Sequence, residues 1–359
     1  MVKDAADIKH NIDAKVKKSL GLRPNPKNFL QQAGKPDVQI LKRLSHSSIL
    51  SAEQFTADLI IEVYKLAALL QQKWVPTKDT LHDKILATAF FEPSTRTRLS
   101  FESAMLFLGG KTLSVAEAAS TGIAKGESMT DIGQMFNSYA NAVVVRHTEQ
   151  KALDELSRYL RIPLINGGNG SDEHPTQALA DWYALAKWNP DLILQKKTEE
   201  KFHLGIVGTP ANMRTVKSFL LLSLLFEKKI EKITIISEMA NPLGSKIPEY
   251  CEKSNIDFAI TDNLHDTLPD LDVVYMNSIA FLGDGYRMLG TQFKLSAKSS
   301  LKKGAVILHP LARKEELDVD LDDTEHNLYF NQADGAVFIR QALLLCIFDR
   351  LESIEKVNI

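Results

Sequence analysis

The chain has 359 residues, 44% of them hydrophobic and 25% charged, which is enough for one or two water-soluble domains with a large core. The net charge of −2 gives no overall attraction to nucleic acid or to an anionic membrane, and no apolar run reaches the ~18 residues of a membrane-spanning helix. Cys251 and Cys346 are too few for a disulfide framework or a zinc site, so we expect a reducing, cytoplasmic location.

Residues 1–40 carry sparse apolar positions among alternating lysines and aspartates. They lack the apolar segment of a signal peptide, and Asp4, Asp7 and Asp13 make them too acidic for a transit peptide. We expect an N-terminal extension of one or two surface helices, with a turn at 23–26. A packing arm against a partner subunit is the alternative.

Short apolar runs alternate with amphipathic stretches from residue 41 to residue 188. Ser51 and Gln54 match a capping box, which predicts a helix from about 50 to about 72. Strands are predicted at 84–91, 112–115, 142–146 and 163–166, and helices at 95–108, 127–139, 153–160 and 174–187. This alternation predicts a parallel α/β sheet.

A charged run at 195–201 marks the boundary to a second α/β series. Its strands are predicted at 203–207, 232–237, 258–261, 273–276 and 306–308, and its helices at 212–226 and 245–253. A last, strongly apolar helix is predicted at 337–351. No G-x-G-x-x-G follows a predicted strand, so a nucleotide-binding Rossmann protein has no support.

The sequence F-F-E-P-S-T-R-T-R at 90–98 lies where a predicted strand ends and a predicted helix begins. A helix N-terminus has unpaired N–H groups and the positive end of the helix dipole, which suits an oxyanion. The hydroxyl groups of Ser94, Thr95 and Thr97 and the guanidinium of Arg96 add charge-assisted hydrogen bonds to a phosphate. The alternative is an ordinary Ser or Thr cap beside a solvated arginine.

Arg146, His147 and His174 also follow predicted strands. Ligand sites in open α/β sheets lie at the carboxyl ends of strands, so these side chains can converge with residues 94–97 on one crevice. His174 could instead be a histidine near an ordinary helix cap. For His147 we expect a structural role.

Five blocks of the sequence resemble, in the same order, those of the aspartate and ornithine carbamoyltransferases. They are S-T-R-T-R at 94–98, R-H at 146–147, H-P-T-Q-A at 174–178, H-P-L at 309–311, and the stretch from Q-A at 332–333 to R-Q-A-L at 340–343. The resemblance covers about residues 50 to 351. It implies two doubly wound parallel α/β domains, with the last helix crossing back to the first. It also implies a carbamoyl-phosphate-binding domain at 41–188 plus 336–359 and an amino-acid-binding domain at 189–335.

The resemblance implies roles for the donor-site residues. Arg96 and Arg146 would bind the phosphate, and Arg146 and His174 would reach the carbonyl oxygen. Gln177 and the backbone carbonyl of Leu311 would bind the amide. The full implied donor set is Ser94, Thr95, Arg96, Thr97, Thr121, Lys125, Arg146, His174, Gln177 and Leu311, with Arg96, Lys125, Arg146 and His174 catalytic. Because an amine attacks the carbamoyl carbon and phosphate leaves, the chemistry needs no metal and no cofactor.

The stretch S-T-G-I-A-K-G-E at 120–127 resembles the loop that aspartate carbamoyltransferases lend to the site of a neighbouring subunit. Lys125 keeps the family's lysine, and Thr121 stands where serine is usual. The resemblance thus implies at least a homotrimer with shared active sites, and it leaves room for larger assemblies with regulatory chains. Taken by itself, the stretch is a solvated loop with one lysine.

The acceptor half of the resemblance is less complete. Arg214, in R-T-V-K-S at 214–218, would bind a carboxylate of the amino acid; the alternative is an exposed helix arginine. Aspartate-specific members usually carry T-R-x-Q where this chain has N-S-I-A, so Ser278 and Ala280 replace the arginine and the glutamine. Arg287, in a rearranged loop nearby, could supply the missing charge.

The leading function is therefore carbamoyl transfer from carbamoyl phosphate to L-aspartate, a step of pyrimidine synthesis. Ser278 and Ala280 leave two alternatives: transfer to a different amine, and a catalytically weak paralogue with a structural or regulatory role. Ala312 replaces the second proline of the family's H-P-L-P-R. The Leu311–Ala312 bond is then either cis, as in the family, or trans with the Leu311 carbonyl displaced.

Overall fold

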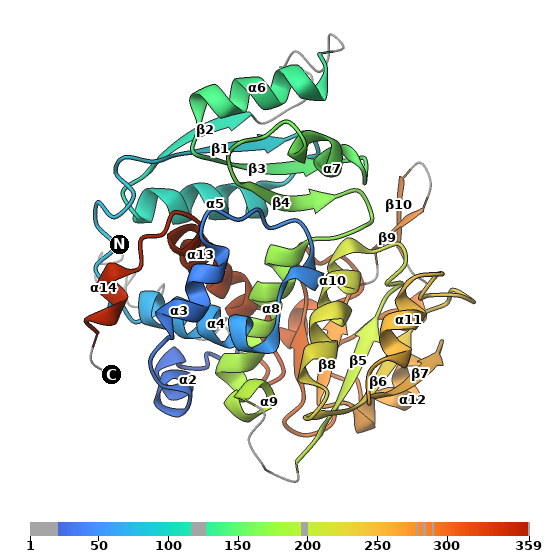
Figure 1. The fold of residues 1–359 in the computed structure, drawn as a ribbon. Coiled ribbons are helices and arrows are strands. Elements are labelled where there is room, and N and C mark those ends of the chain that lie inside the picture. Colours follow the sequence, from blue (N-terminus) through green and yellow to red (C-terminus); the bar gives the residue numbers. More distant parts are fainter. Residues whose placement is uncertain are drawn as a thin grey trace, which may run out of the picture.

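Two parallel sheets lie in separate parts of the molecule, with a group of helices between and beside them (Figure 1). The computed structural model describes residues 21–115, 127–194, 200–277, 279–282, 285–288 and 291–357. The prediction of two doubly wound parallel α/β domains is confirmed. Within these residues no helix combines the length and the apolar character needed to cross a bilayer.

The first sheet has four parallel strands in the order β2-β1-β3-β4. Leu86 and Phe90 of β1 pack with α5 and α8, whereas Ala87 and Ala89 pack with α6 and α7 on the opposite face. Because both faces are covered, the central strands β1 and β3 are nearly continuous apolar runs, which is why the sequence predicted them well, whereas the edge strand β2 is largely exposed. The strands are β1 (Ile85–Phe90), β2 (Lys111–Val115), β3 (Ala142–His147) and β4 (Leu164–Asn169), and the helices are α5 (Thr95–Phe107), α6 (Met129–Tyr139), α7 (Ala152–Ser157) and α8 (Pro175–Trp188).

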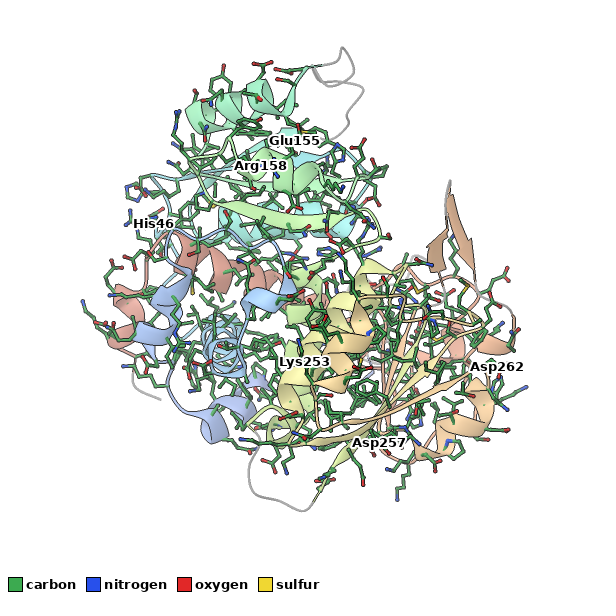
Figure 2. The ribbon with its side chains drawn as sticks, turned by 45° about the vertical axis from the view of Figure 1, so that its right-hand side comes forward. His46, Glu155, Arg158, Lys253, Asp257 and Asp262 are labelled. Carbon is green, nitrogen blue, oxygen red and sulfur yellow. The ribbon has the colours of Figure 1, made fainter. Side chains whose placement is uncertain are left out.

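The second sheet has five parallel strands in the order β11-β8-β5-β6-β7. The edge strand β7 begins at the exposed Asp257 and is followed by the exposed Asp262 (Figure 2), and such charges disfavour pairing of an edge with another chain. The strands are β5 (Phe202–Val207), β6 (Ile230–Ile236), β7 (Asp257–Thr261), β8 (Val273–Met276) and β11 (Val306–Leu308), and the helices are α10 (Arg214–Ser223), α11 (Ile247–Glu252) and α12 (Leu264–Thr267).

The long helix α13 (Tyr329–Ile347) starts beside β11 and packs on α5, α8 and α4 (Ala57–Gln71) of the first domain (Figure 1). The predicted crossing of the last helix is therefore confirmed. The helix begins at Tyr329 and not at 337 as predicted. The prediction missed its first turns because they carry polar side chains, among them Asn331 and Gln332, that are nevertheless buried.

The predicted helix at 50–72 is wrong at its start. Ser51 and Gln54 do form a capping box, but it closes a single 3₁₀ turn at Ala52–Gln54, and α4 begins only at Ala57. A short turn can therefore satisfy the capping pattern without the longer helix.

Residues 26–41 belong to the helical layer of the first domain. The expected turn at 23–26 is the start of α2 (Pro26–Ala33), where the Asn25 side chain accepts from the N–H of Lys27. Phe29 and Leu30 are fully buried against a layer that includes α4, α8 and α9 (Pro190–Leu194). The short helices α3 (Val38–Leu41) and α14 (Glu352–Glu355) complete this layer. Residues 1–20 lie outside the described residues.

An antiparallel hairpin occupies the segment where the sequence pattern indicated a loop. It consists of β9 (Ile279–Leu282) and β10 (Gly285–Met288), with Ala280 opposite Arg287 in the register. Figure 1 shows the hairpin standing out from the second domain.

Candidate active site

A cavity of about 490 Å³ lies between the two domains, where strands of both sheets reach their carboxyl ends. Residues that follow β1 and β4, with Arg146 near the end of β3, form one side, and residues that follow β5, β8 and β11 form the other. The predicted convergence is therefore present in the structure. The predicted donor-site residues that line the cavity are Ser94, Thr95, Arg96, Thr97, Arg146, His174, Gln177 and Leu311.

The N-terminus of α5 opens into this cavity. Ser94 occupies the N-cap position, but its side chain makes no capping hydrogen bond; its Oγ accepts from Arg146 Nη1 at 3.2 Å instead. The first-turn N–H groups thus keep no side-chain cap, and Arg96 and Arg146 stand beside them. This geometry favours an oxyanion site over an ordinary serine cap.

Glu92 is a central residue of the cavity that sequence reasoning missed. Its buried carboxylate accepts from Arg146 Nη2 at 2.6 Å and from Arg214 Nη2 at 2.6 Å through Oε1, and from Arg214 Nη1 at 2.9 Å through Oε2. One carboxylate therefore joins a cation of the first domain to a cation of the second. No local pattern marks such a residue, because its partners are distant in the sequence.

His174 is buried at the start of α8, with Nε2 3.2 Å from Thr97 Oγ1. Its backbone N–H donates to Ser218 Oγ at 2.9 Å, which fixes the residue against α10. Burial, with a smaller contribution from the charge of Arg340, lowers the pKa of His174 to about 3, so the imidazole is neutral at pH 7. A neutral imidazole can donate one hydrogen bond to a carbonyl oxygen.

His147 packs edge-on against Phe91, with 5.7 Å between ring centroids, and its Nδ1 accepts from the N–H of Glu149 at 3.0 Å. It is not among the described lining residues of the cavity. The predicted structural role fits this position.

The loop after β11 brings Leu311 to the cavity. The Leu311–Ala312 peptide bond is cis, which decides between the two alternatives that the sequence left open. The Leu311 carbonyl accepts a hydrogen bond from Arg96 Nη2, and the Leu311 N–H donates to His309 Nδ1 at 2.8 Å. His309 Nε2 in turn lies 2.9 Å from Glu316 Oε1. This buried His–Glu pair holds the loop in place.

Two family models match the chain. The carbamoyl-P binding domain of aspartate/ornithine carbamoyltransferase matches residues 47–187, and the Asp/Orn binding domain matches residues 200–347. The chain belongs to the aspartate/ornithine carbamoyltransferase family. Helices α2 and α3 precede the region that these models match.

Similar proteins of known name are aspartate carbamoyltransferases. The catalytic subunit from Chromobacterium violaceum is 34% identical over 306 residues, covering 84% of this chain and 97% of its own length. That from Clostridium acetobutylicum is 34% identical over 315 residues, with the same coverage. The crystal structure of aspartate transcarbamoylase from Trypanosoma cruzi in complex with carbamoyl phosphate and aspartate is 27% identical, with a TM-score of 0.74 over 86% of this chain and 98% of that one.

The second domain contributes Asn212, Arg214, Thr215 and Asn277 to the cavity of this carbamoyltransferase-family chain. Arg214 Nη1 also donates to the carbonyl of Gly170 at 2.5 Å. Gly168 has a φ of +116°, and a Cβ there would lie 3.2 Å from Arg214 Nε. Glycine at this position therefore leaves room for the guanidinium as well as allowing the backbone conformation.

Several predicted site residues are not placed in the cavity. Thr121, Lys125 and Ser278 lie outside the described residues. Ala280 and Arg287 belong to the β9–β10 hairpin, and their side chains lie outside the part of the chain that the structure describes. Lys314 reaches the cavity from the loop after β11, a contribution that no sequence motif indicated.

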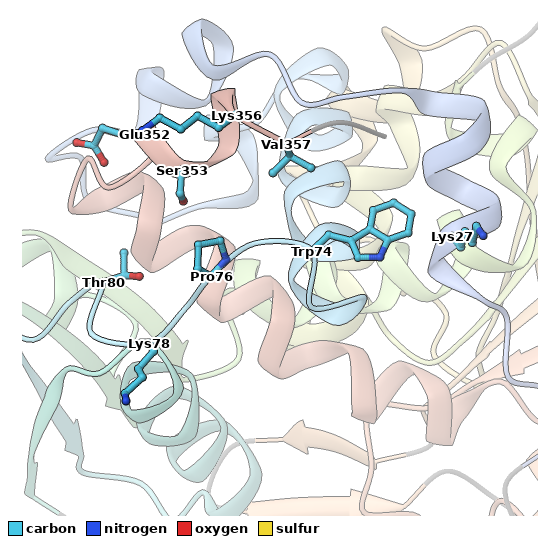
Figure 3. Close-up of a pocket in the computed structure, with 9 residues that line it drawn as sticks. All are labelled: Lys27, Trp74, Pro76, Lys78, Thr80, Glu352, Ser353, Lys356 and Val357. Carbon is cyan, nitrogen blue, oxygen red and sulfur yellow. The ribbon is translucent and has the colours of Figure 1, made fainter.

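A larger open hollow of about 1010 Å³ lies elsewhere, between α2, the loop after α4 and α14 (Figure 3). Lys27, Lys78 and Lys356 surround Trp74 and Val357 there, and none of the described lining residues is buried. The smaller cavity, in contrast, is lined by the buried ionisable side chains of Glu92, His174 and His309. Among the described residues, no cluster of His, Cys, Asp and Glu could hold a metal ion.

Proposed function

We propose that this chain transfers the carbamoyl group of carbamoyl phosphate to the amino group of L-aspartate, giving N-carbamoyl-L-aspartate and phosphate. The observation that carries the proposal is a single cavity in which an uncapped helix N-terminus with Arg96 and Arg146 faces Arg214 from the other domain. One side suits a phosphate dianion and the other suits a carboxylate. The names of the similar aspartate carbamoyltransferases support the same reaction.

The phosphate binds at the start of α5, to first-turn N–H groups, to the hydroxyls of Ser94, Thr95 and Thr97, and to Arg96. Arg146 lies beside Ser94 and shares this charge. Two guanidiniums held at a helix N-terminus stabilise the negative charge that grows on the departing phosphate. This set positions the donor before the reaction, so little reorganisation remains for the transition state.

The carbamoyl carbonyl oxygen becomes more negative as the amine attacks. Neutral His174 and cationic Arg146 donate to that oxygen and stabilise the tetrahedral intermediate. With a pKa of about 3, His174 is a neutral imidazole at pH 7 and not an imidazolium, so it donates a hydrogen bond without acting as a general acid, and the leaving phosphate takes the proton of the amine. Gln177 and the Leu311 carbonyl bind the amide group.

Arg214 binds a carboxylate of the acceptor, and its pairing with Glu92 holds its guanidinium at the cavity. Arg287 on the adjacent hairpin supplies the second positive charge that Ser278 and Ala280 lack. Transfer to a different amine and a catalytically weak paralogue are both less favoured, because the donor half is complete and the similar relatives are named for aspartate.

The oligomer we propose is a homotrimer in which Thr121 and Lys125 serve a neighbouring site. Leu99, Leu106 and Phe107 of α5 and Leu113 of β2 are 46–62% exposed, an unusual concentration of large apolar side chains on one edge of the first sheet. We further propose that the chain divides into domains at 41–188 plus 336–359 and at 189–335. We also propose a cytoplasmic location and an assembly with regulatory chains.

An amine panel tests the reaction. The full chain is incubated with carbamoyl phosphate and, in turn, aspartate, ornithine, N-acylated ornithines and other amino acids, and the ureido product is measured. We expect turnover with aspartate alone. Turnover only with another amine, or with none, would contradict the proposal.

Arg287→Ala tests the acceptor side. Loss of a cation that pairs with a carboxylate should raise the KM for aspartate about 30-fold or more, since such pairs contribute ~2 kcal/mol or more. Lys253→Ala removes an exposed lysine of the same domain (Figure 2) and should leave the KM unchanged. An unchanged KM in Arg287→Ala would remove Arg287 from the site.

A further inference from the structure

A buried chain of hydrogen bonds lies behind the donor half of the cavity. It runs from Asp181 of α8 through Gln332 of α13 to the backbone N–H of His309, in the loop after β11. Asp181 is fully buried, and Gln332 and His309 are almost so. None of the roles proposed above uses Asp181 or Gln332.

The donor and acceptor roles in this series of hydrogen bonds follow from the chemistry of its groups. A backbone N–H can only donate, so the 2.8 Å hydrogen bond from His309 N ends on the carbonyl oxygen Oε1 of Gln332. The Gln332 amide nitrogen must then face Asp181, and it donates to Oδ1 at 2.6 Å. Reversing this amide would leave the buried His309 N–H without an acceptor.

The same Oδ1 of Asp181 accepts from Gln177 Nε2 at 2.7 Å. Gln177 is half-buried and lines the cavity. Because its nitrogen is held on Asp181, its carbonyl oxygen Oε1 is the atom left to face a ligand. A reversed Gln177 would place its carbonyl oxygen against a carboxylate oxygen, which is repulsive.

The other end of the chain supports a second acceptor oxygen. His309 Nδ1 accepts from the Leu311 N–H, so the residue that is held by Gln332 also holds Leu311. The Leu311 carbonyl faces the cavity, where it accepts from Arg96. Gln177 Oε1 and Leu311 O are thus presented by one connected set of hydrogen bonds.

We propose that Asp181 and Gln332 are positioning residues that aim these two oxygens at the –NH₂ group of the donor and so select a carbamoyl over an acetyl group. This inference rests on the proposed function. An –NH₂ group satisfies two acceptors, whereas a methyl group of the same size leaves both without a partner in a partly buried site. Sites built to bind an N–H reject analogues that lack it far more strongly than apolar pockets reject a similar shape.

The arrangement does not depend on the charge of Asp181. Burial raises the pKa of Asp181 to about 7, opposed by its hydrogen bonds and by Arg340. The groups around it are Gln177, Gln332 and Arg340, with Tyr275 and Tyr64 on the neighbouring elements. Tyr275 OH lies 2.9 Å from Oδ2, so a proton on Oδ2 leaves Oδ1 free to accept from both glutamines.

The test compares two donors, carbamoyl phosphate and acetyl phosphate, by calorimetric binding to the full chain in the absence of an acceptor. We expect the wild type to bind carbamoyl phosphate at least about 10-fold more tightly. Asp181→Leu should weaken carbamoyl phosphate binding by about 10- to 100-fold, the loss of one or two directed hydrogen bonds, and change acetyl phosphate binding by less than about threefold.

Two variants serve as matched controls. Asp181→Asn keeps a carbonyl oxygen for both glutamines and should retain the preference for carbamoyl phosphate. Tyr275→Phe removes only the partner of the other carboxylate oxygen and should retain it as well. A merely structural role of Asp181 would weaken both donors together, and that result would overturn the proposal, as would equal binding of both donors by the wild type.

Gln332→Met provides a second route if Asp181→Leu does not fold, which thermal melting would show. This substitution removes the hydrogen bonds that link His309 to Asp181, and it should reduce the preference for carbamoyl phosphate over acetyl phosphate as Asp181→Leu does. An unchanged preference in a folded Gln332→Met would count against the proposal. Because binding is measured without an acceptor, failure of the amine panel would be a separate result.

Discussion

At the scale of single residues, Glu92 decides how the two halves of the cavity are connected. Its carboxylate lies between Arg146 and Arg214, both with about a tenth of their side chains exposed. Removing one member of such a buried set leaves an uncompensated charge. The resulting loss of stability is far larger than the net stability that the intact set contributes. Arg214, the proposed ligand of the acceptor, is therefore fixed by the same carboxylate that fixes Arg146, a proposed ligand of the donor.

His174 gives a pH dependence of stability with a definite sign. The native imidazole has a pKa of about 3, whereas the unfolded one takes up a proton near 6.5. The unfolded state then binds more protons at acid pH, so the free energy of unfolding falls as the pH drops from about 6.5 toward about 3. Between pH 7 and pH 5 this group alone accounts for a loss of about 2 kcal/mol.

Urea unfolding of the wild type and of His174→Asn at the two pH values measures this loss. Burial also lowers the pKa of His309 and His147, so the wild type loses stability for those groups as well. The contribution of His174 is therefore obtained by comparing the two proteins. Between pH 7 and pH 5, the free energy of unfolding of the wild type should fall by about 2 kcal/mol more than that of His174→Asn. Equal pH dependence in both proteins would show that His174 takes up a proton as readily in the native state as in the unfolded state.

At the scale of elements, the sequence predicted those strands and helices whose pattern serves packing alone. The run Ala142–Val145 is buried on both faces, and its strand was predicted with nearly the observed bounds. The start of α13 was missed because Gln332 is polar yet buried, and its partners come from other elements. Local patterns fail where polar side chains enter the core to serve a site.

The residues of the candidate site likewise fall into those that the sequence predicted and those that it did not. Ser94, Arg96, Arg146 and His174 were found because they follow strands or stand in recognisable blocks. Gln332 also stands in one of these blocks, but its contacts, like those of Glu92 and Asp181, are pairings between distant segments that no spacing in the sequence indicates. The hairpin at β9 and β10 was taken for a loop because glycines interrupt a short apolar run.

Helix α2 tests whether the region before the matched family domains belongs to the core. Phe29 is fully buried, so Phe29→Ala should lower the free energy of unfolding by about 3–5 kcal/mol, the usual cost of emptying a phenylalanine site. Lys27→Ala, at an exposed position of the same helix, should change it by less than about 0.5 kcal/mol. Both are measured by urea unfolding. A Phe29→Ala protein as stable as the wild type would mean that α2 is an appendage.

At the scale of the whole molecule, the two sheets share their largest core, and each has a smaller apolar cluster of its own on its other face. One apolar cluster extends from β1 and α5 through α4, α8 and α13 to α10 and β5. The cavity lies where this shared body ends and the carboxyl ends of both sheets meet. The spacing between donor and acceptor groups therefore depends on helix packing, and α8 and α13 carry both the packing and the buried hydrogen bonds behind Gln177.

The apolar edge on α5 and β2 leads to the last prediction, which concerns the oligomer. Leu106 is 59% exposed beside Phe107 at 62%, and in a trimer that buries this edge a charge at Leu106 would be desolvated without a partner. Leu106→Glu should therefore shift the mass measured by light scattering from three chains to one. If active sites are shared, carbamoyl transfer should be lost at the same time.

Val319→Glu places the same charge on an isolated exposed valine of the second domain, 68% exposed, and should keep both the wild-type mass and the wild-type activity. A wild type that already has the mass of one chain would contradict the trimer outright. A monomeric Leu106→Glu that retains full activity would keep the interface but contradict the shared site, because Lys125 of a neighbour would then be dispensable. Measuring the mass and the carbamoyl-transfer activity of the same variants thus separates the effect on assembly from the effect on catalysis.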